Sequence, residues 1–261
     1  MILIHFIVYL LIILSLQNDL LALRDISTTI CQFTFWIAAV IGEQNVILNV
    51  VIMRLFIILA EIGTLFLIPQ ILKKLEFDTA KLKWYAYNPL VIVELTGNLH
   101  YEGLMIFFLC LAIYLLLEHK IIFSALVFSC AISTKLLPLM FLPILFSYLS
   151  WRKTIIYYFF TLIGLASLFI WFIDLDMVQN MGESVNLYFK RFEFNASIYY
   201  IVRWIGFQVK GYNIIGTAGV RLTFVPIILI ALFSLIKSKD LKVVIVKMLF
   251  AMCIYFFSAT I

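Results

Sequence analysis

Side chains that could carry acid–base chemistry gather in one stretch, residues 84–103, of a chain otherwise dominated by apolar residues. His100 and Glu102 are the candidate catalytic pair, because imidazole and carboxylate groups are the usual general acids and bases of enzymes. Each also has a plainer explanation: Glu102 could favour the dipole of a helix start, and His100 could be a solvated loop residue. Their clustering favours a site, since ionisable groups at membrane depth are costly and usually functional.

Two asparagines and a glycine predict how this polar stretch folds. Asn88 precedes a proline, a combination typical of a helix start, here on the cytoplasmic side. We expect Gly97 to end that helix in a left-handed conformation, and Asn98 to cap a second helix whose first turn holds residues 100–102. Because the free amides of a helix start bind anions, Asn88 and Asn98 are candidate substrate-binding residues. Glu94 is another, and its depth predicts a hydrogen-bonded or protonated carboxyl group.

Two basic positions further along the chain could meet a phosphate. Lys135 interrupts the apolar run 121–149, and its ammonium group could bind phosphate or simply extend to the membrane interface. Arg191 lies in an aromatic and basic segment, residues 188–207, that is typical of an interfacial helix. That segment could anchor the protein at the membrane surface or contact a substrate, and both alternatives stay open.

Arg54 and Glu61 form a second charged pair within an apolar run. Their spacing of seven residues puts them on one helix face, two turns apart, which is too far for direct contact. We therefore expect each to find a partner on another helix, and a packing role is favoured over catalysis.

Composition excludes a soluble globular protein. Apolar residues make up 65% of the 261 residues and charged residues 13%, against roughly half and a quarter in soluble domains. The apolar runs are continuous rather than alternating, so helices are favoured over a β-barrel. We predict an all-α polytopic bundle of about eight to nine membrane helices, several of them short or broken, forming a single domain over residues 1–261. The runs that predict them are 1–16, 46–72, 84–95, 104–117, 121–133, 136–149, 154–173, 216–236 and 243–261.

Basic residues lie between the apolar runs, in alternate short loops such as 73–83 and 237–242. This pattern places those loops in the cytoplasm and predicts a multi-pass membrane protein. It also argues against nucleic acid as a partner, because the net charge of +5 forms no continuous stripe. The four cysteines lie singly and are interpreted as packing residues. The sequence specifies no cofactor, although a divalent cation stays open as an alternative.

Four stretches together resemble a known family: residues 54–63, 87–103, 134–138 and 188–199. The most specific is the block from Asn88-Pro to His100-Tyr-Glu-Gly. It resembles bacterial mannosyltransferase-like members of the GT-C superfamily of polytopic glycosyltransferases, which are related to the glycosylphosphatidylinositol mannosyltransferases. The resemblance implies transfer of a hexose, with mannose favoured, from a polyprenyl-phosphate donor to a lipid or glycan acceptor on the outer side of the membrane.

The resemblance also implies roles for individual residues. Glu102 or His100 would deprotonate the acceptor, and Lys135, Arg191 and the helix start at Asn98 would stabilise the departing phosphate. Asn195 lies within the last matching stretch and is a further substrate-binding candidate.

The family's essential carboxylate is expected in a first outer loop, for which residues 17–30 offer Asp19 and Asp25. Those residues lack the acidic, aromatic character expected there. The chain therefore resembles a partial member, incomplete at both ends and inactive alone. The alternatives are a multispan transporter or lipid flippase, for which broken helices are also typical, and a non-catalytic membrane scaffold.

Overall fold

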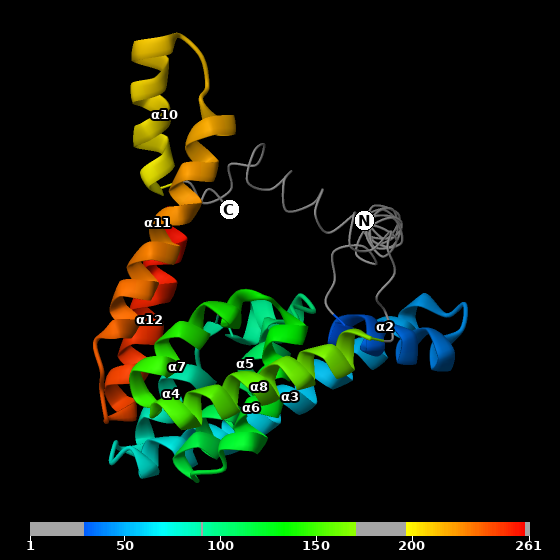
Figure 1. Cartoon of the computed structure of the whole chain (residues 1–261). Helices are drawn as coiled ribbons and strands as arrows, with labels where there is room; N and C mark the ends of the chain where they lie inside the picture. Colours follow the sequence, from blue (N-terminus) through cyan, green and yellow to red (C-terminus); the bar gives the residue numbers. More distant parts are fainter. Residues whose placement is uncertain (1–28, 90, 171–196, 259–261) are drawn as a thin grey trace. The chain divides into compact units, whose positions relative to one another are not determined.

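The computed structural model describes residues 29–89, 91–170 and 197–258, and every regular element within them is a helix (Figure 1). The all-α prediction is confirmed for these residues. The predicted helix 1–16 and the residues Asp19, Asp25, Arg191 and Asn195 lie outside them. The elements in chain order are α2 (Thr29–Gly42), α3 (Val46–Lys74), the 3-10 helix η1 (Thr79–Leu82), α4 (Lys83–Ala86), the π-helix η2 (Val91–Gly97), α5 (Glu102–Leu117), α6 (Ile121–Thr134), the 3-10 helix η3 (Leu137–Phe141), α7 (Leu142–Tyr148), α8 (Trp151–Phe169), α10 (Ser197–Lys210), α11 (Ile215–Leu235) and α12 (Leu241–Ser258).

Two of these helices, α3 and α11, are long and apolar enough to cross a membrane. The pair η2 and α5 makes a third candidate if it counts as one span, bent by 107° at its break. The predicted helices over 46–72 and 216–236 and the expected broken helix are thus confirmed, as candidate spans by length and composition. The total of eight to nine membrane helices is not confirmed by the described residues and stays a prediction.

α3 has the features of a helix that its own sequence specifies. The side chain of Asn45 accepts the amide of Leu48 at 3.1 Å and caps its start, and lysines occupy its last turn, where they offset the helix dipole. Buried residues such as Ile57 and Ala60 share one face, whereas Leu59 and Phe66 on the other are 65% and 70% exposed. An apolar face this open suits contact with lipid.

The chain forms two compact units, and each is described by itself. The first comprises residues 1–136 and 160–177, so it contains α2 to α6 and the later part of α8. Here α5 packs against α6 and α3, with small residues at the contacts. A side chain on Gly63 would place its Cβ 2.4 Å from the Phe107 ring, and the Ser124 hydroxyl donates to the Ala112 carbonyl at 2.8 Å. Small and hydroxylated residues of this kind let membrane helices approach closely.

The second unit comprises residues 137–159 and 178–261. In it α11 packs against α7 and α12. Lys247 is buried on α12, and its ammonium group donates to the carbonyl of Ile236, which follows the last turn of α11. A cation at this end of a helix offsets its dipole.

α10, also in the second unit, has one apolar side packed on α11 around the buried Tyr199. Its opposite side exposes Ile201 and Trp204, and Arg203 lies over the Tyr200 ring. Exposed aromatic and apolar side chains beside a cation are typical of a helix at a membrane interface. The interfacial position predicted for residues 188–207, of which 197–207 are described, stays a prediction.

Candidate functional site

The polar turn lies between η2 and α5, and the chain reverses there differently from the prediction. The left-handed residue is Leu99, with φ of 59°, rather than Gly97. The amides of Asn98 and His100 bond back to the carbonyls of Val93 and Leu95 at 3.0 and 3.2 Å. A bond from the residue after a left-handed position to a carbonyl five residues back is the closure of a Schellman motif. The π-helix therefore runs to Gly97 and turns two residues later than expected.

The predicted cap at Asn98 is wrong for the same reason. α5 begins at Glu102 with Tyr101 in the N-cap position, and among the described residues no side chain caps it. Glu102 does lie in the first turn, as expected, whereas His100 precedes the helix. Asn88 does precede a helical segment, since its carbonyl accepts the amide of Ile92 at 3.2 Å.

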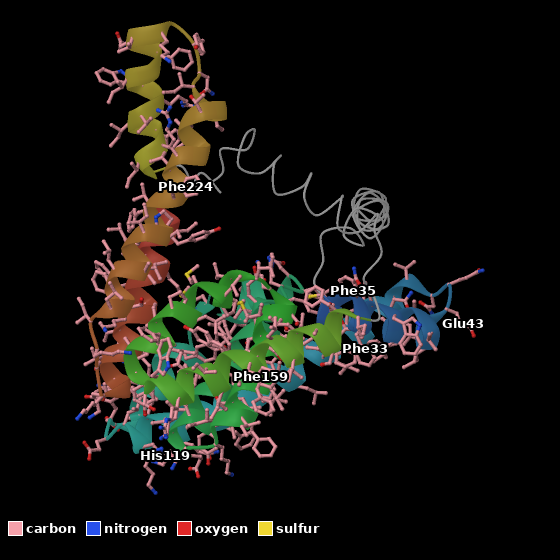
Figure 2. The ribbon with its side chains drawn as sticks, in the orientation of Figure 1. Phe33, Phe35, Glu43, His119, Phe159 and Phe224 are labelled. Atoms are coloured by element: carbon pink, nitrogen blue, oxygen red, sulfur yellow. The ribbon has the colours of Figure 1, made fainter. Side chains whose placement is uncertain are left out.

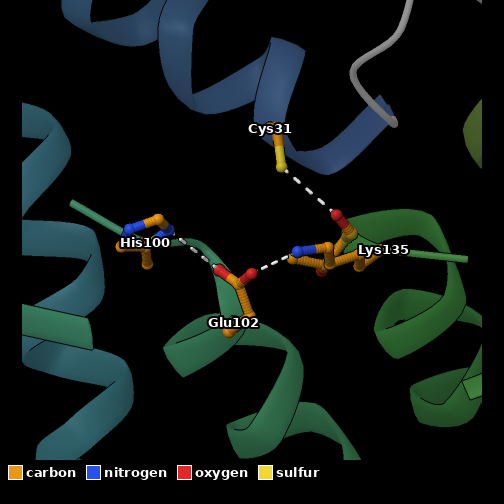
Figure 3. Close-up of polar contacts among 5 residues, drawn as sticks. Cys31, His100, Glu102 and Lys135 are labelled. Atoms are coloured by element: carbon orange, nitrogen blue, oxygen red, sulfur yellow. Dashed lines mark hydrogen bonds and ion pairs between the residues drawn. The ribbon is translucent and has the colours of Figure 1, made fainter. Parts of the chain in front are cut away.

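Three of the predicted site residues come together across this turn (Figure 3). The Lys135 ammonium group donates to Oε1 of Glu102, and Nδ1 of His100 lies 3.5 Å from Oε2 of the same carboxylate. Their side chains are 50%, 30% and 51% exposed for Lys135, Glu102 and His100. Glu102 thus stands between a cation and an imidazole, and all three remain open to a ligand.

Lys135 reaches Glu102 because it lies where α6 ends. It is the C-cap residue, in extended conformation, and its amide still bonds the Ala131 carbonyl at 3.2 Å. Leaving the helix at this point turns its side chain toward the start of α5. The candidate site therefore joins one helix end to one helix start.

α2 contacts both the start of α5 and the end of α6. These contacts were not predicted from the sequence. The hydroxyls of Thr34 and Tyr101 share a hydrogen bond of 2.7 Å, and the Phe35 ring meets the Tyr101 ring edge-on at 5.4 Å. Cys31 donates its thiol to the Thr134 carbonyl at 3.4 Å. These contacts hold the residue before Glu102 and the residue before Lys135.

Phe33, two residues before Phe35, lies on the opposite side of α2 (Figure 2). It is 50% exposed and stacks on Trp36. α2 therefore turns one aromatic side toward the polar turn and leaves another uncovered.

Arg54 and Glu61 find partners outside α3, as predicted. Arg54 donates to the Gly97 carbonyl at 3.1 Å, at the end of η2. The Tyr85 hydroxyl lies 3.0 Å from both oxygens of the buried Glu61 carboxylate.

A second ion pair lies at the far ends of α3 and α5. Lys74 and Glu118 are 2.5 Å apart, and the Lys74 ammonium holds the pKa of the Glu118 carboxyl below its usual range. The loops that follow α3 and α5 carry lysines that the topology prediction places in the cytoplasm.

The structure describes no contact between the cluster and the other predicted site residues. Glu94 lies on η2, and its side chain is outside the described part. Asn98 is exposed within the turn itself. Within residues 29–89, 91–170 and 197–258, no group of three or more His, Cys, Asp or Glu residues is arranged to hold a metal ion.

Comparison with known proteins adds one match. Residues 29–151 match the family model described as alpha-(1->6)-mannopyranosyltransferase, N-terminal domain. No curated protein and no solved structure matches the chain. The matched range contains the polar turn, Lys135 and both residues of the Arg54 and Glu61 pair. The resemblance to bacterial mannosyltransferase-like members of the GT-C superfamily is thereby confirmed over these residues.

Proposed function

We propose, from the match of residues 29–151 to a mannosyltransferase domain, that the chain is a membrane-embedded glycosyltransferase. It moves a hexose, with mannose favoured, from a polyprenyl-phosphate donor to a lipid or glycan acceptor on the outer face of the membrane. The observation that carries the proposal is that Lys135, Glu102 and His100 meet inside the matched range. A cation, a carboxylate and an imidazole in contact are the groups that such a transfer requires.

The chemistry assigns one role to each group. The acceptor hydroxyl gives its proton to the Glu102 carboxylate or the His100 imidazole, and its oxygen attacks the anomeric carbon. The bond from that carbon to the phosphate oxygen breaks, and polyprenyl phosphate leaves with the electron pair. Lys135 stabilises the negative charge on the leaving phosphate.

The ion pair between Glu102 and Lys135 sets the order of these events. While Lys135 neutralises Glu102, the carboxylate is a weaker base than a free one. A donor phosphate that binds the ammonium group separates the pair and releases the carboxylate for proton transfer. Binding of the donor thus prepares the base.

A lipid-linked donor fits the apolar surroundings of this turn. α3 and the bent pair η2–α5 are candidate membrane helices next to the polar cluster, so a prenyl chain can lie in lipid while its phosphate meets Lys135.

The proposal includes the topology of the chain in the membrane. We propose eight to nine membrane helices in the bacterial inner membrane, with the lysine-rich loops 73–83 and 237–242 in the cytoplasm. The proposed substrate-binding residues also include Asn88, Glu94, Asn98, Arg191 and Asn195.

Binding of undecaprenyl phosphate to the purified chain in detergent tests the proposal. Lys135→Ala should weaken binding at least about tenfold, because a charge-assisted bond to phosphate is lost. Arg152→Ala, at an exposed arginine of α8, should leave it unchanged and serves as the matched control. Equal losses of binding in both variants would mean that binding depends on nonspecific charge, and would overturn the assignment.

The same protein in vesicles separates the transferase from the transporter or flippase. Movement of a fluorescent polyprenyl phosphate between leaflets, abolished by Lys135→Ala and independent of any acceptor, would favour a flippase. Transfer of labelled mannose to a co-reconstituted acceptor would favour the enzyme.

A further inference from the structure

α3 holds the segment that precedes the polar turn at both of its ends. Near the beginning of the segment, the hydroxyl of Tyr85 on α4 bonds both carboxylate oxygens of Glu61, at 3.0 Å each. At its end, the guanidinium group of Arg54 donates to the carbonyl of Gly97 at 3.1 Å. One helix therefore fixes residues 85–97 through two side chains.

Arg54 and Glu61, the two anchors of this segment, are held at a fixed separation along α3. Seven residues separate Arg54 from Glu61, which corresponds to about 10 Å along α3. α3 is continuous over 29 residues and packs its buried face against α5, so the two anchor points cannot shift independently. η2 needs such support, because the wide turns of a π-helix are less stable than α-helical turns and occur mostly at functional sites.

The Arg54 bond falls at the point where the chain changes direction. The Gly97 carbonyl ends η2, and the last carbonyls of a helix lack partners within it and carry its negative dipole end. Leu99 follows in the left-handed conformation, and His100 and Glu102 come next. Displacing the Gly97 carbonyl would therefore redirect the residues of the proposed site.

The Glu61 anchor also lies against the other side of the break. A Cβ built on Gly103 would be 3.1 Å from Oε1 of Glu61, so the carboxylate lies beside the first turn of α5. Glu61 thus touches both the beginning of the bent segment, through Tyr85, and the helix that carries Glu102.

We propose that Arg54 and Glu61 are positioning residues that fix the angle between η2 and α5, and through it the contact of His100 and Glu102 with Lys135. The catalytic consequence rests on the proposed function, whereas the geometric claim stands by itself. Neither residue touches the reacting groups. Both act through the backbone of residues 85–103.

Hydrogen exchange of the full chain in detergent, read by mass spectrometry, tests the geometric claim. Arg54→Met removes the donor and keeps an apolar stem of similar length, while Arg152→Met is the matched control. In Arg54→Met the peptide covering the Asn98 and His100 amides should exchange about tenfold faster or more. Lys135 should also react faster with trinitrobenzenesulfonate, because Glu102 no longer holds it.

Conservative variants distinguish positioning from general stability. Arg54→Lys keeps a cation and a donor and should restore most of the protection, and Tyr85→Phe should loosen residues 85–97 while leaving the aromatic ring in place. Peptides within 106–117 and 121–133 should keep wild-type exchange in all of them. If Arg54→Met does not fold, Arg54→Gln and Tyr85→Phe carry the test.

Two results would overturn the proposal. One is unchanged exchange at 97–103 in Arg54→Met, and the other is faster exchange spread evenly over α5 and α6, which would mean a general loss of stability. If exchange responds as expected but the wild-type chain binds no undecaprenyl phosphate, the proposed function fails and the positioning role stands. If Lys135→Ala weakens binding while exchange is insensitive to Arg54, the reverse holds.

Discussion

α3 and the pair η2–α5 are neighbours in the first unit, yet they are built in opposite ways. α3 runs unbroken for 29 residues, with Asn45 capping its start and two lysines in its last turn. The pair is bent by 107°, turns through a leucine in the left-handed region, and α5 starts without a side-chain cap among the described residues. What α3 obtains from its own sequence, the bent pair obtains from bonds that α2, α3 and α6 supply.

This difference shows how a polar site can persist in an apolar chain. Between its two ends, a straight helix satisfies its own backbone groups and has none to offer a ligand. The break leaves backbone and side-chain polar groups near the surface of the unit, and neighbouring helices keep them in place. The regular helix is thus the support, and the irregular one is the candidate site.

The largest expected effect is a loss of turnover when the Glu102 carboxylate at the break is removed. It distinguishes a catalytic role of this residue from a structural one. In a form of the protein that transfers sugar, Glu102→Gln should lower turnover by about 100-fold or more, since it removes the proton acceptor but keeps size and hydrogen bonding. Glu43→Gln, at the exposed turn before α3 (Figure 2), is the matched control. The assay is steady-state transfer from mannosyl-phosphoryl undecaprenol.

Two other outcomes would change the assignment. Unchanged turnover and folding in Glu102→Gln would exclude Glu102 as the base and leave that role to another carboxylate, with Asp19 and Asp25 as the next candidates. Loss of folded protein in Glu102→Gln would instead favour a structural role at the start of α5.

The sequence predicted the self-sufficient helix far better than the supported one. Residues 46–72 were expected to span and α3 covers Val46–Lys74, because a long apolar run, an asparagine cap and terminal lysines are all local signals. The break near 97–102 was also predicted from its polar residues. Its geometry was not, because Leu99 adopts a conformation that leucine avoids by itself and that the surrounding contacts impose.

The partners of the site were out of reach for a similar reason. Thr34 meets Tyr101 across 67 positions, and Cys31 meets Thr134 across 103. Neither residue stands out in an apolar helix, and single-sequence patterns carry no information on such distant contacts. The pairing of Lys135 with Glu102 was foreseen only as membership of one site, not as an ion pair.

A second prediction concerns the contact between the two regions, where α3 meets α5. Gly63→Ala should lower the free energy of unfolding by about 1–3 kcal/mol, because its Cβ would lie 2.4 Å from the Phe107 ring. Gly216→Ala on α11 should instead be neutral or slightly stabilising, since a Cβ there meets no described atom within 4 Å. Thermal unfolding in detergent measures both. A cost for Gly216→Ala equal to that for Gly63→Ala would mean that the close contact is not the cause.

A third prediction contrasts the two helix starts. Asn45→Ala should cost about 1 kcal/mol of unfolding free energy, because it removes the hydrogen bond to the Leu48 amide. Asn98→Ala should leave the start of α5 in place, since that helix begins at Glu102 after Tyr101. Hydrogen exchange of the first turns of both helices reports the difference. Fraying of the start of α5 in Asn98→Ala would support the prediction from the sequence that Asn98 caps this helix.

The smallest effect is a pH dependence at the lysine-rich ends of the two helices. The folded pKa of Glu118 lies below its unfolded value because of Lys74, so the pair contributes stability above the ordinary carboxyl range and loses it as the pH falls through the folded pKa. Glu118→Gln should remove this part of the acid sensitivity. Added salt should weaken it too, because both side chains are partly exposed. Melting curves across acidic pH measure it, and identical curves for Glu118→Gln and wild type would exclude the contribution.

The left-handed conformation of Leu99 should change which substitutions this position accepts. Most apolar positions in this chain should accept valine or isoleucine more readily than asparagine, yet a β-branched residue is strongly disfavoured at a φ of 59°, whereas glycine and asparagine adopt it easily. In a saturation library the usual hydropathy ranking should therefore invert at this one position. The inversion would mark the hinge of the bent helix from genetic data alone, before any ligand is known.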